Sequence, residues 1–262
     1  MYNKFSLQAY TVRDHMESAE DVKSTFKQLA AMGYTGIQTA DDFIKCPVEL
    51  YAQAAEDAGL EIVGTHYGSK SVALYAADDA EFEKYLAIHK TLNTKNAGIG
   101  GAVHRSVAEI MQFIENANRL GEKLSKYGMR FTYHHHSQEF AKVEGKRPMD
   151  LLVDGLDKKL TAFVLDTYWL NNAGVDVNAW IEKLAGRCDI LHIKDRGVKP
   201  FTSEGYITEV GNGNLDFKTI LKTAEDVGIE HICVEQDIWP EGVDSLECAR
   251  RSAEYLKNVL LK

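Results

Sequence analysis

Four apolar runs in this sequence each lead to a side chain that could bind a metal ion. These side chains are Glu139, shortly after the run 131–136, Asp166 after 162–165, His192 after 190–191, and Glu235 after 232–234. An ionised group at the end of a buried strand is costly unless it is paired or bound to a metal. Carboxylate and imidazole groups together suit a divalent ion. If the strand ends meet at one face, these residues predict a site for one divalent ion with room for a substrate.

The fourth ligand is the position that the sequence leaves open. Residues 133–140 contain three consecutive histidines as well as Glu139. Neighbouring side chains of a strand face opposite ways, so His134 and His136 share one direction and His135 takes the other. All three rings therefore cannot point at one ion, which argues against a three-histidine zinc site. We expect Glu139 to be the ligand, with His136 as its main rival.

Five further side chains near these strand ends are expected to bind a substrate. They are His66, His134, Trp169, Lys194 and Asp237. Lys194 and Asp237 each follow an expected ligand by two residues, so they share its direction on a strand. Trp169 offers an apolar ring to the face of a sugar. The alternative for each is a rim residue whose polar group only bonds a loop.

The elements that would hold these residues alternate between strands and helices. The expected strands cover 4–10, 36–40, 60–66, 96–101, 129–136, 161–166, 189–193 and 231–236. The expected helices cover 18–32, 47–58, 78–93, 104–127, 148–155, 176–185, 215–227 and 243–260. Four helix-to-strand junctions carry a glycine suited to a left-handed helix end, namely Gly33, Gly59, Gly128 and Gly228. Such alternation indicates a parallel α/β fold, and eight units favour a closed (β/α)₈ TIM barrel.

Closure of the barrel predicts that the first strand pairs with both the second and the eighth. The glycine-rich fourth strand is the weakest of the eight predictions. The segments 137–147 and 196–214 are expected to be long loops that carry substrate contacts. Because no linker or charge block interrupts the sequence, we expect one domain over residues 1–262.

Composition and missing motifs narrow the function. The chain has 262 residues and a formal net charge of −9, which argues against binding nucleic acid. No apolar run approaches the roughly 20 residues of a membrane span, and no apolar signal sequence or close cysteine pair is present. Nucleotide-binding loops and the serine-hydrolase motif are absent from the sequence as well. We therefore expect a cytoplasmic protein whose partner is a small molecule, and the sequence leaves association into a homo-oligomer open.

Six segments spread over nearly the whole chain resemble the sugar isomerase/epimerase superfamily, whose fold is a xylose-isomerase-like TIM barrel. They are 6–13, 133–140, 165–169, 192–195, 209–213 and 234–237. The resemblance implies a metal site formed here by Glu139, Asp166, His192 and Glu235, for one Mn²⁺, Mg²⁺, Co²⁺ or Zn²⁺ ion. The fifth strand carries histidines where ketose epimerases have a glutamate. The branch that contains inosose dehydratase and enzymes acting on 3-keto-glycosides is therefore the more similar one.

The expected reaction is removal of a proton next to a carbonyl that the ion polarises, in a keto sugar or related polyol. Glu139 and Glu235 would act as acid and base, with His136 as a further catalytic residue. Return of the proton makes the protein an isomerase or epimerase, whereas loss of a β-substituent makes it a lyase or dehydratase. A phosphodiesterase of the endonuclease IV type is a rival function, which the negative charge disfavours. A sugar-binding or accessory barrel subunit without catalytic activity is another.

Overall fold

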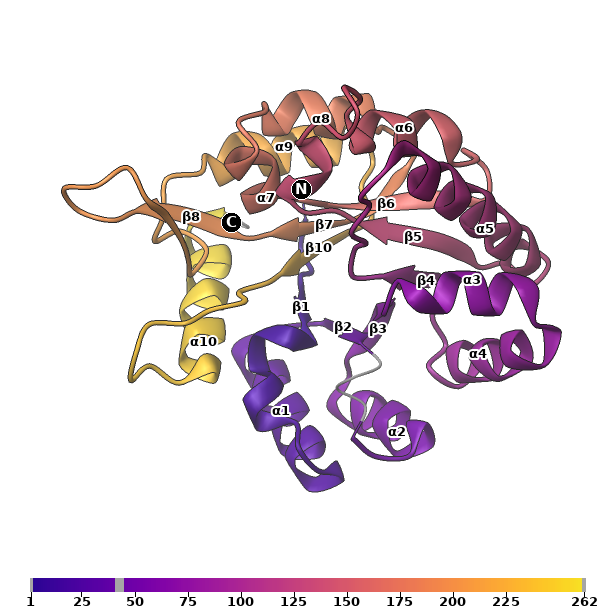
Figure 1. Ribbon diagram of the computed structural model, residues 1–262. Helices are drawn as coiled ribbons and strands as arrows, with labels where there is room; N and C mark the ends of the chain where they lie inside the picture. The colour runs from indigo at the N-terminus through magenta and orange to yellow at the C-terminus, as the bar shows by residue number, and fades with distance from the viewer. Residues whose placement is uncertain (1, 41–44, 261–262) are drawn as a thin grey trace.

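The computed structural model describes residues 2–40 and 45–260, in which eight parallel strands close into a barrel (Figure 1). The strands are β1 (Ser6–Gln8), β2 (Gly36–Ala40), β3 (Glu61–Tyr67), β4 (Asn96–Ile99), β5 (Arg130–His134), β6 (Thr161–Asp166), β7 (Cys188–Ile193) and β10 (His231–Val234). Ser6 of β1 pairs with Gly36 of β2 and with Cys233 of β10, which confirms the predicted closure. The glycine-rich β4 also forms, and it pairs with both β3 and β5.

Helices surround the barrel on its outside (Figure 1). They are α1 (Ala19–Met32), α2 (Val48–Ala58), α3 (Lys70–Ala77), α4 (Asp79–Thr91), α5 (Val107–Ser125), α6 (Pro148–Gly155), α7 (Thr167–Asn172), α8 (Val177–Lys183), α9 (Phe217–Asp226) and α10 (Ser245–Tyr255). Eight of them match the predicted helices, and the two short helices α3 and α7 were not predicted. Among the described residues, no helix is both long and apolar enough to cross a membrane.

The glycines expected at helix-to-strand junctions all adopt the left-handed backbone. Their φ angles are +105° at Gly33, +72° at Gly59, +72° at Gly128 and +79° at Gly228. A side chain with a Cβ is disfavoured in this region, so glycine ends each helix at little conformational cost. After Gly33 the chain needs only two residues before it enters β2. These junctions keep consecutive units close to the barrel.

An apolar layer lies inside the barrel, directly below the strand ends. Val63, Val164, Ile190 and Cys233 are buried and form one cluster. Three of them precede an expected ligand by two residues, since 164 leads to 166, 190 to 192 and 233 to 235. Alternate residues of a strand share a face, so the apolar layer and the ionisable groups point the same way. The layer therefore forms an apolar floor beneath the site.

Two register shifts between neighbouring strands change which side chains point into the barrel. Between β2 and β3 the pairing changes from Ile37↔Ile62 to Gln38↔Gly64, which makes Val63 an extra residue. Between β6 and β7 it changes from Phe163↔Cys188 to Val164↔Ile190, so that Asp189 is extra there. A bulge of this kind resets which side chains of a strand face inward. In this barrel the shifts bring His66 and His192 inside.

The segment 196–214, expected to be a long loop between a strand and a helix, contains a two-stranded antiparallel hairpin that was not predicted. Strands β8 (Asp195–Val198) and β9 (Gly205–Thr208) pair with each other and extend away from the barrel at the left of Figure 1. The buried side chain of Asp195 holds the two ends of this hairpin segment together. Its carboxylate accepts hydrogen bonds from the backbone N–H groups of Arg196 (2.7 Å), Gly211 (2.9 Å), Gly213 (2.9 Å) and Leu215 (3.2 Å).

Replacement of Asp195 by alanine is expected to lower the free energy of unfolding by about 3 kcal/mol, because several N–H groups lose a charged acceptor at once. Urea denaturation followed by circular dichroism measures this change. Asp226→Ala is the control, since it removes only the exposed ion pair with Lys222 and should cost less than about 1 kcal/mol. Equal losses in the two variants would show that Asp195 does not anchor the segment.

Candidate functional site

Four buried side chains meet above the apolar floor, at the C-terminal ends of four strands. One ligand atom from each of His134, Asp166, His192 and Glu235 lies within 4.8 Å of the others. His192 Nδ1 is 2.7 Å from Glu235 Oε2 and 3.8 Å from Asp166 Oδ2, and His134 Nε2 is 3.6 Å from the same Asp166 oxygen. Two imidazoles and two carboxylates at these spacings could hold one divalent ion.

The bonding of His134 fits a cation at the centre of this group. His134 Nδ1 lies 3.3 Å from the carbonyl oxygen of Gly100. A carbonyl only accepts, so Nδ1 carries the ring proton and Nε2 is left with a lone pair. Within the described part of the chain, His134 Nε2 is buried and lacks a hydrogen-bond partner, and it lies 3.6 Å from Asp166 Oδ2. A cation placed between them would complete the bonding of this ring nitrogen.

Lys194 holds the carboxylates of the site together. Its Nζ lies 2.8 Å from Glu235 Oε2, 2.9 Å from Asp237 Oδ2 and 3.1 Å from Asp166 Oδ2. Burial lowers the pKa of the Lys194 ammonium, but the three carboxylates raise it by more, so the group stays charged. Three carboxylates against one ammonium leave an excess of negative charge, which favours binding of a divalent cation.

The carboxyl groups of Glu235 and Asp237 differ in their readiness to accept a proton. Burial raises the pKa of Glu235, but Lys194 and His192 outweigh it and hold this pKa well below its usual range. Burial and the neighbouring Glu235 raise the pKa of Asp237 to about 6. Glu235 is therefore ionised at neutral pH, whereas Asp237 can exchange a proton close to it.

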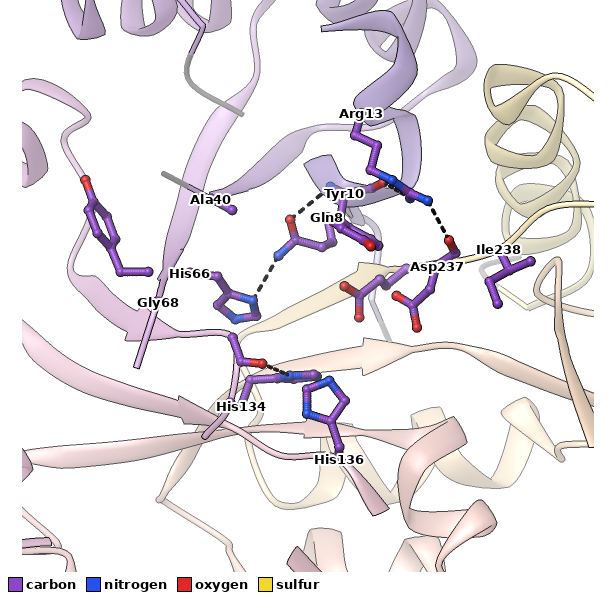
Figure 2. Close-up of a pocket in the computed structure, with 14 residues that line it drawn as sticks. Gln8, Tyr10, Arg13, Ala40, His66, Gly68, His134, His136, Asp237 and Ile238 are labelled. Carbon is purple, nitrogen blue, oxygen red and sulfur yellow. Dashed lines mark hydrogen bonds between the residues drawn. The ribbon is translucent and has the colours of Figure 1, made fainter. Parts of the chain in front are cut away.

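A cavity of about 580 Å³ opens from the buried group toward solvent (Figure 2). Its lining residues are Gln8, Tyr10, Arg13, Ala40, His66, Tyr67, Gly68, Gly100, Gly101, His134, His136, Glu235, Asp237 and Ile238. In Figure 2 the rings of His66, His134 and His136 border the space on one side, and Arg13 and Asp237 border it on another. The structure thus gathers three of the expected substrate-binding residues, His66, His134 and Asp237, around one space.

His136 lines the cavity and is held there by close packing. Burial and the neighbouring His134 lower the pKa of His136 to about 3, so its ring is neutral. A Cβ at Gly101, where φ is +117°, would lie 2.8 Å from His136 Nδ1, so only glycine fits beside the ring. The ring of Trp169 is 5.1 Å from that of His136. Trp169 and Lys194 are not among the described residues that line the cavity, so they support its wall rather than face it.

Glu139, the expected fourth ligand, is not brought into the group. The chain after β5 turns through a 3₁₀ helix, η3 (Ser137–Phe140). This turn directs the Glu139 carboxylate back onto the backbone N–H of His136 and the hydroxyl of Tyr133, both at 2.9 Å. Glu139 lines a separate cavity of about 50 Å³ beside His104. His134 occupies the fourth position instead, so the ligand set that the geometry favours is His134, Asp166, His192 and Glu235.

Sequence reasoning passed over several residues at the site, among them Gln8, Gln38 and Arg13. Gln8 is a buried polar group at the end of β1, the same signal that singled out the ligands, whereas Gln38 is a buried polar group in the middle of β2. Arg13 gives no such signal, because it lies outside the strands and its contact at the site is with the backbone of Asp237, 224 positions away. Its guanidinium donates to the carbonyl oxygens of Tyr10 (2.7 Å) and Asp237 (2.9 Å) and thereby ties two sides of the cavity mouth together.

Comparison with known sequences gives one family and one recurrent enzyme name. The model of the xylose isomerase-like TIM barrel family matches residues 26–259. Inosose dehydratase of Clostridium perfringens is 25% identical over 273 residues, covering 90% of each chain. Inosose dehydratase of Salmonella typhimurium is also 25% identical, over 276 residues, covering 91% of this chain and 90% of its own.

Solved structures give the same architecture. A sugar phosphate isomerase/epimerase from Parabacteroides distasonis has a TM-score of 0.83 and 25% identity, covering 99% of this chain and 95% of its own. D-allulose 3-epimerase from Methylomonas sp. has a TM-score of 0.69 and 15% identity, covering 97% and 96%. At that lower identity the second likeness is one of fold alone.

Proposed function

The chain belongs to the xylose isomerase-like TIM barrel family, and from that premise we propose that it is a divalent-metal-dependent isomerase or epimerase of a keto sugar or related polyol. The observation that carries the proposal is the group of His134, Asp166, His192 and Glu235 at the base of the cavity. This donor set suits Mn²⁺, Mg²⁺, Co²⁺ or Zn²⁺. A small sugar or polyol is the proposed partner, because polar side chains lie at the base of the cavity. The net charge of −9 disfavours nucleic acid as an alternative partner.

The roles of the residues follow from their positions. When bound, the ion would supply Lewis acidity toward a carbonyl oxygen of the substrate. Glu235 lines the cavity and is ionised, so it is our candidate for the base that takes the proton from the neighbouring carbon. Asp237 has a pKa of about 6 and lines the same cavity, so it can return a proton. His66 and His136 present ring nitrogens to substrate oxygens. Glu139 falls outside this acid–base set because it lines the separate cavity.

A dehydratase is the second candidate, and the name shared by the curated relatives favours it. Elimination begins with the same removal of a proton next to a carbonyl, and it ends when a β-hydroxyl leaves as water. Asp237 would protonate that leaving group, since it lines the cavity and has a pKa of about 6, and the neutral ring of His136 could donate a hydrogen bond to it. The same residues could therefore catalyse either isomerisation or dehydration, and identifying the product distinguishes the two reactions.

The proposal is tested by solvent exchange on a panel of ketoses, inososes and 3-keto-glycosides in D₂O. Metal-free protein is prepared with a chelator, reloaded with Mn²⁺, Mg²⁺, Co²⁺ or Zn²⁺, and its metal content is measured. We expect one ion per chain and metal-dependent loss of an α-proton signal in NMR spectra. A new sugar diastereomer or isomer would identify an isomerase or epimerase, and an enone or dione with release of water a dehydratase. Loaded protein that exchanges no proton in any of these substrates would refute the proposal.

A further inference from the structure

Gln38 lies at the centre of a buried hydrogen-bond network between the metal group and the cavity. It is fully buried at the register shift of β2. Its Oε1 is 2.5 Å from His192 Nε2 and 3.1 Å from Gln8 Nε2, and its Nε2 is 2.9 Å from His66 Nε2. One carboxamide thus contacts a candidate metal ligand and two residues that line the cavity.

The direction of every hydrogen bond in this network follows from one backbone group. The N–H of Tyr10 can only donate, and it lies 3.2 Å from Gln8 Oε1. Gln8 therefore turns its Nε2 toward Gln38 and donates to Gln38 Oε1. With Oε1 facing Gln8 and His192, the amide nitrogen of Gln38 is left to donate to His66 Nε2. An amide oxygen only accepts and an amide nitrogen only donates, so this arrangement satisfies the contacts of Gln38 with Gln8, His192 and His66.

For His192, this network fixes which ring nitrogen is available to an ion. Nε2 must keep its proton to donate to Gln38 Oε1. Nδ1 is then the atom that faces the metal group. It lies 3.8 Å from Asp166 Oδ2 and 2.7 Å from Glu235 Oε2, within hydrogen-bond distance, so a bound ion would replace the proton that Nδ1 shares with Glu235. A hydrogen bond to the far nitrogen also holds the plane of the ring.

For His66, the same network sets the opposite tautomer. Its Nε2 accepts from Gln38, so the ring proton lies on Nδ1. Nδ1 is 3.2 Å from Gln8 Nε2, an amide nitrogen that also carries a hydrogen (Figure 2). Two adjacent donors cannot satisfy each other. Both residues line the 580 Å³ cavity, so both can donate to one acceptor oxygen placed there.

We propose that Gln38 is a positioning residue that sets the tautomers of His192 and His66, and that Gln8 and His66 consequently form a donor pair for one oxygen of the substrate. That oxygen is a carbonyl, hydroxyl or ether oxygen, because both protein groups donate. The His192 half of the inference rests on the proposed metal-dependent function, whereas the His66 half does not.

The tautomer of His66 is read directly from two-bond ¹H–¹⁵N spectra of metal-free protein labelled with ¹⁵N-histidine. His66→Gln identifies its signals among the nine histidines. We expect the Nδ1–H form in the wild type. In Gln38→Glu, both carboxylate oxygens accept, so His66 should change to the Nε2–H form. A wild-type ring in the Nε2–H form, or an unchanged ring in Gln38→Glu, would overturn this half.

The effect on His192 is measured as affinity for Mn²⁺ alone, by titration calorimetry. Gln38→Leu should weaken Mn²⁺ binding about 10–100-fold, as loss of a hydrogen bond to a ligand histidine does. Gln38→Glu keeps the acceptor and should bind within about threefold of the wild type, or more tightly. Gln138→Leu is the matched control, because its amide contacts Ala102 O and not the network, and it should bind as the wild type does.

The outcomes separate this inference from the proposed function. If Gln38→Leu binds Mn²⁺ as tightly as the wild type, or Gln38→Glu loses as much affinity as Gln38→Leu, the inference fails and the metal site stands. If the wild type binds no divalent ion, the proposed function fails, and with it the His192 half. Thermal unfolding checks that the variants are folded. If Gln38→Leu does not fold, Gln38→Glu alone tests the inference. It should keep its affinity for Mn²⁺ and show the Nε2–H form of His66.

Discussion

Replacement of Asp166 by alanine is expected to abolish stoichiometric binding of a divalent ion. Asp166 is fully buried at the end of β6, and its Oδ2 faces His134 Nε2 and His192 Nδ1. Removing it takes away both an anionic ligand and half of the carboxylate charge of the four-residue group. The affinity should fall by more than about 100-fold, beyond the effect of losing a supporting contact. Metal content after dialysis and calorimetry with Mn²⁺ measure the loss.

Asp166 also caps helix α7, and this structural role must be separated from metal binding. Its Oδ1 accepts from the N–H of Trp169 and caps α7, so alanine also costs about 1 kcal/mol of stability. Asp166→Asn keeps a capping oxygen and should still lose the ion. Asp176→Ala is the control, since Asp176 caps α8 in the same way but lies outside the group, and it should keep the ion. Full occupancy and affinity in Asp166→Ala would remove this residue from the ligand set.

Conversion of Glu235 to glutamine is expected to remove the exchange of the substrate α-proton while the fold persists. The carboxylate lines the cavity and is kept ionised at neutral pH by Lys194 and His192. An amide of the same shape cannot take up a proton at that pH. The exchange rate should drop about 10²–10⁴-fold, the usual contribution of a general base. The rate is measured by NMR in D₂O at saturating Mn²⁺, on the substrate that the wild type exchanges fastest.

Glu209→Gln provides the matched control for this variant. Glu209 is buried to a similar degree, but its carboxylate contacts Arg251 and Thr208 outside the cavity. We expect it to retain exchange at the wild-type rate. Glu235→Gln protein that is saturated with Mn²⁺ and exchanges as fast as the wild type would assign the base to another residue. Asp237 would then be the next candidate, because it lines the cavity and has a pKa of about 6.

The positions of the strands and of three ligand candidates could be predicted from the sequence because they depend on local patterns. A run of apolar residues that ends on Asp166, His192 or Glu235 reports both a buried strand and the place where it meets polar surroundings. The two-residue period of a strand fixes which side chains share a face. It therefore predicted that Lys194 follows the direction of His192, and the contacts of Lys194 with Asp166 and Glu235 agree. The glycines that follow helices likewise predicted the helix-to-strand junctions from a few neighbouring residues.

The fourth member of the group was decided by the tertiary structure. His134 and Glu139 are five residues apart, and either could reach the ion in a chain considered alone. The 3₁₀ turn after β5 directs Glu139 to Tyr133 and to the N–H of His136, while Gly100, just after the neighbouring strand β4, orients the ring of His134. The choice depends on contacts between strands, which no periodicity in one strand encodes.

The sequence by itself determined a closed parallel barrel with ionisable groups at one end of it, since apolar period and helix-ending glycines act within a few residues. Only the tertiary structure decided how these groups are oriented. Gln38 and His192 are 154 positions apart in the chain, yet one hydrogen bond between them settles which nitrogen of the ring is free. The pairings of β2 with β1, of β1 with β10 and of β10 with β7 set the levels at which such partners lie in the barrel. Register is set by pairing with the next strand, so the sequence of a single strand cannot specify it.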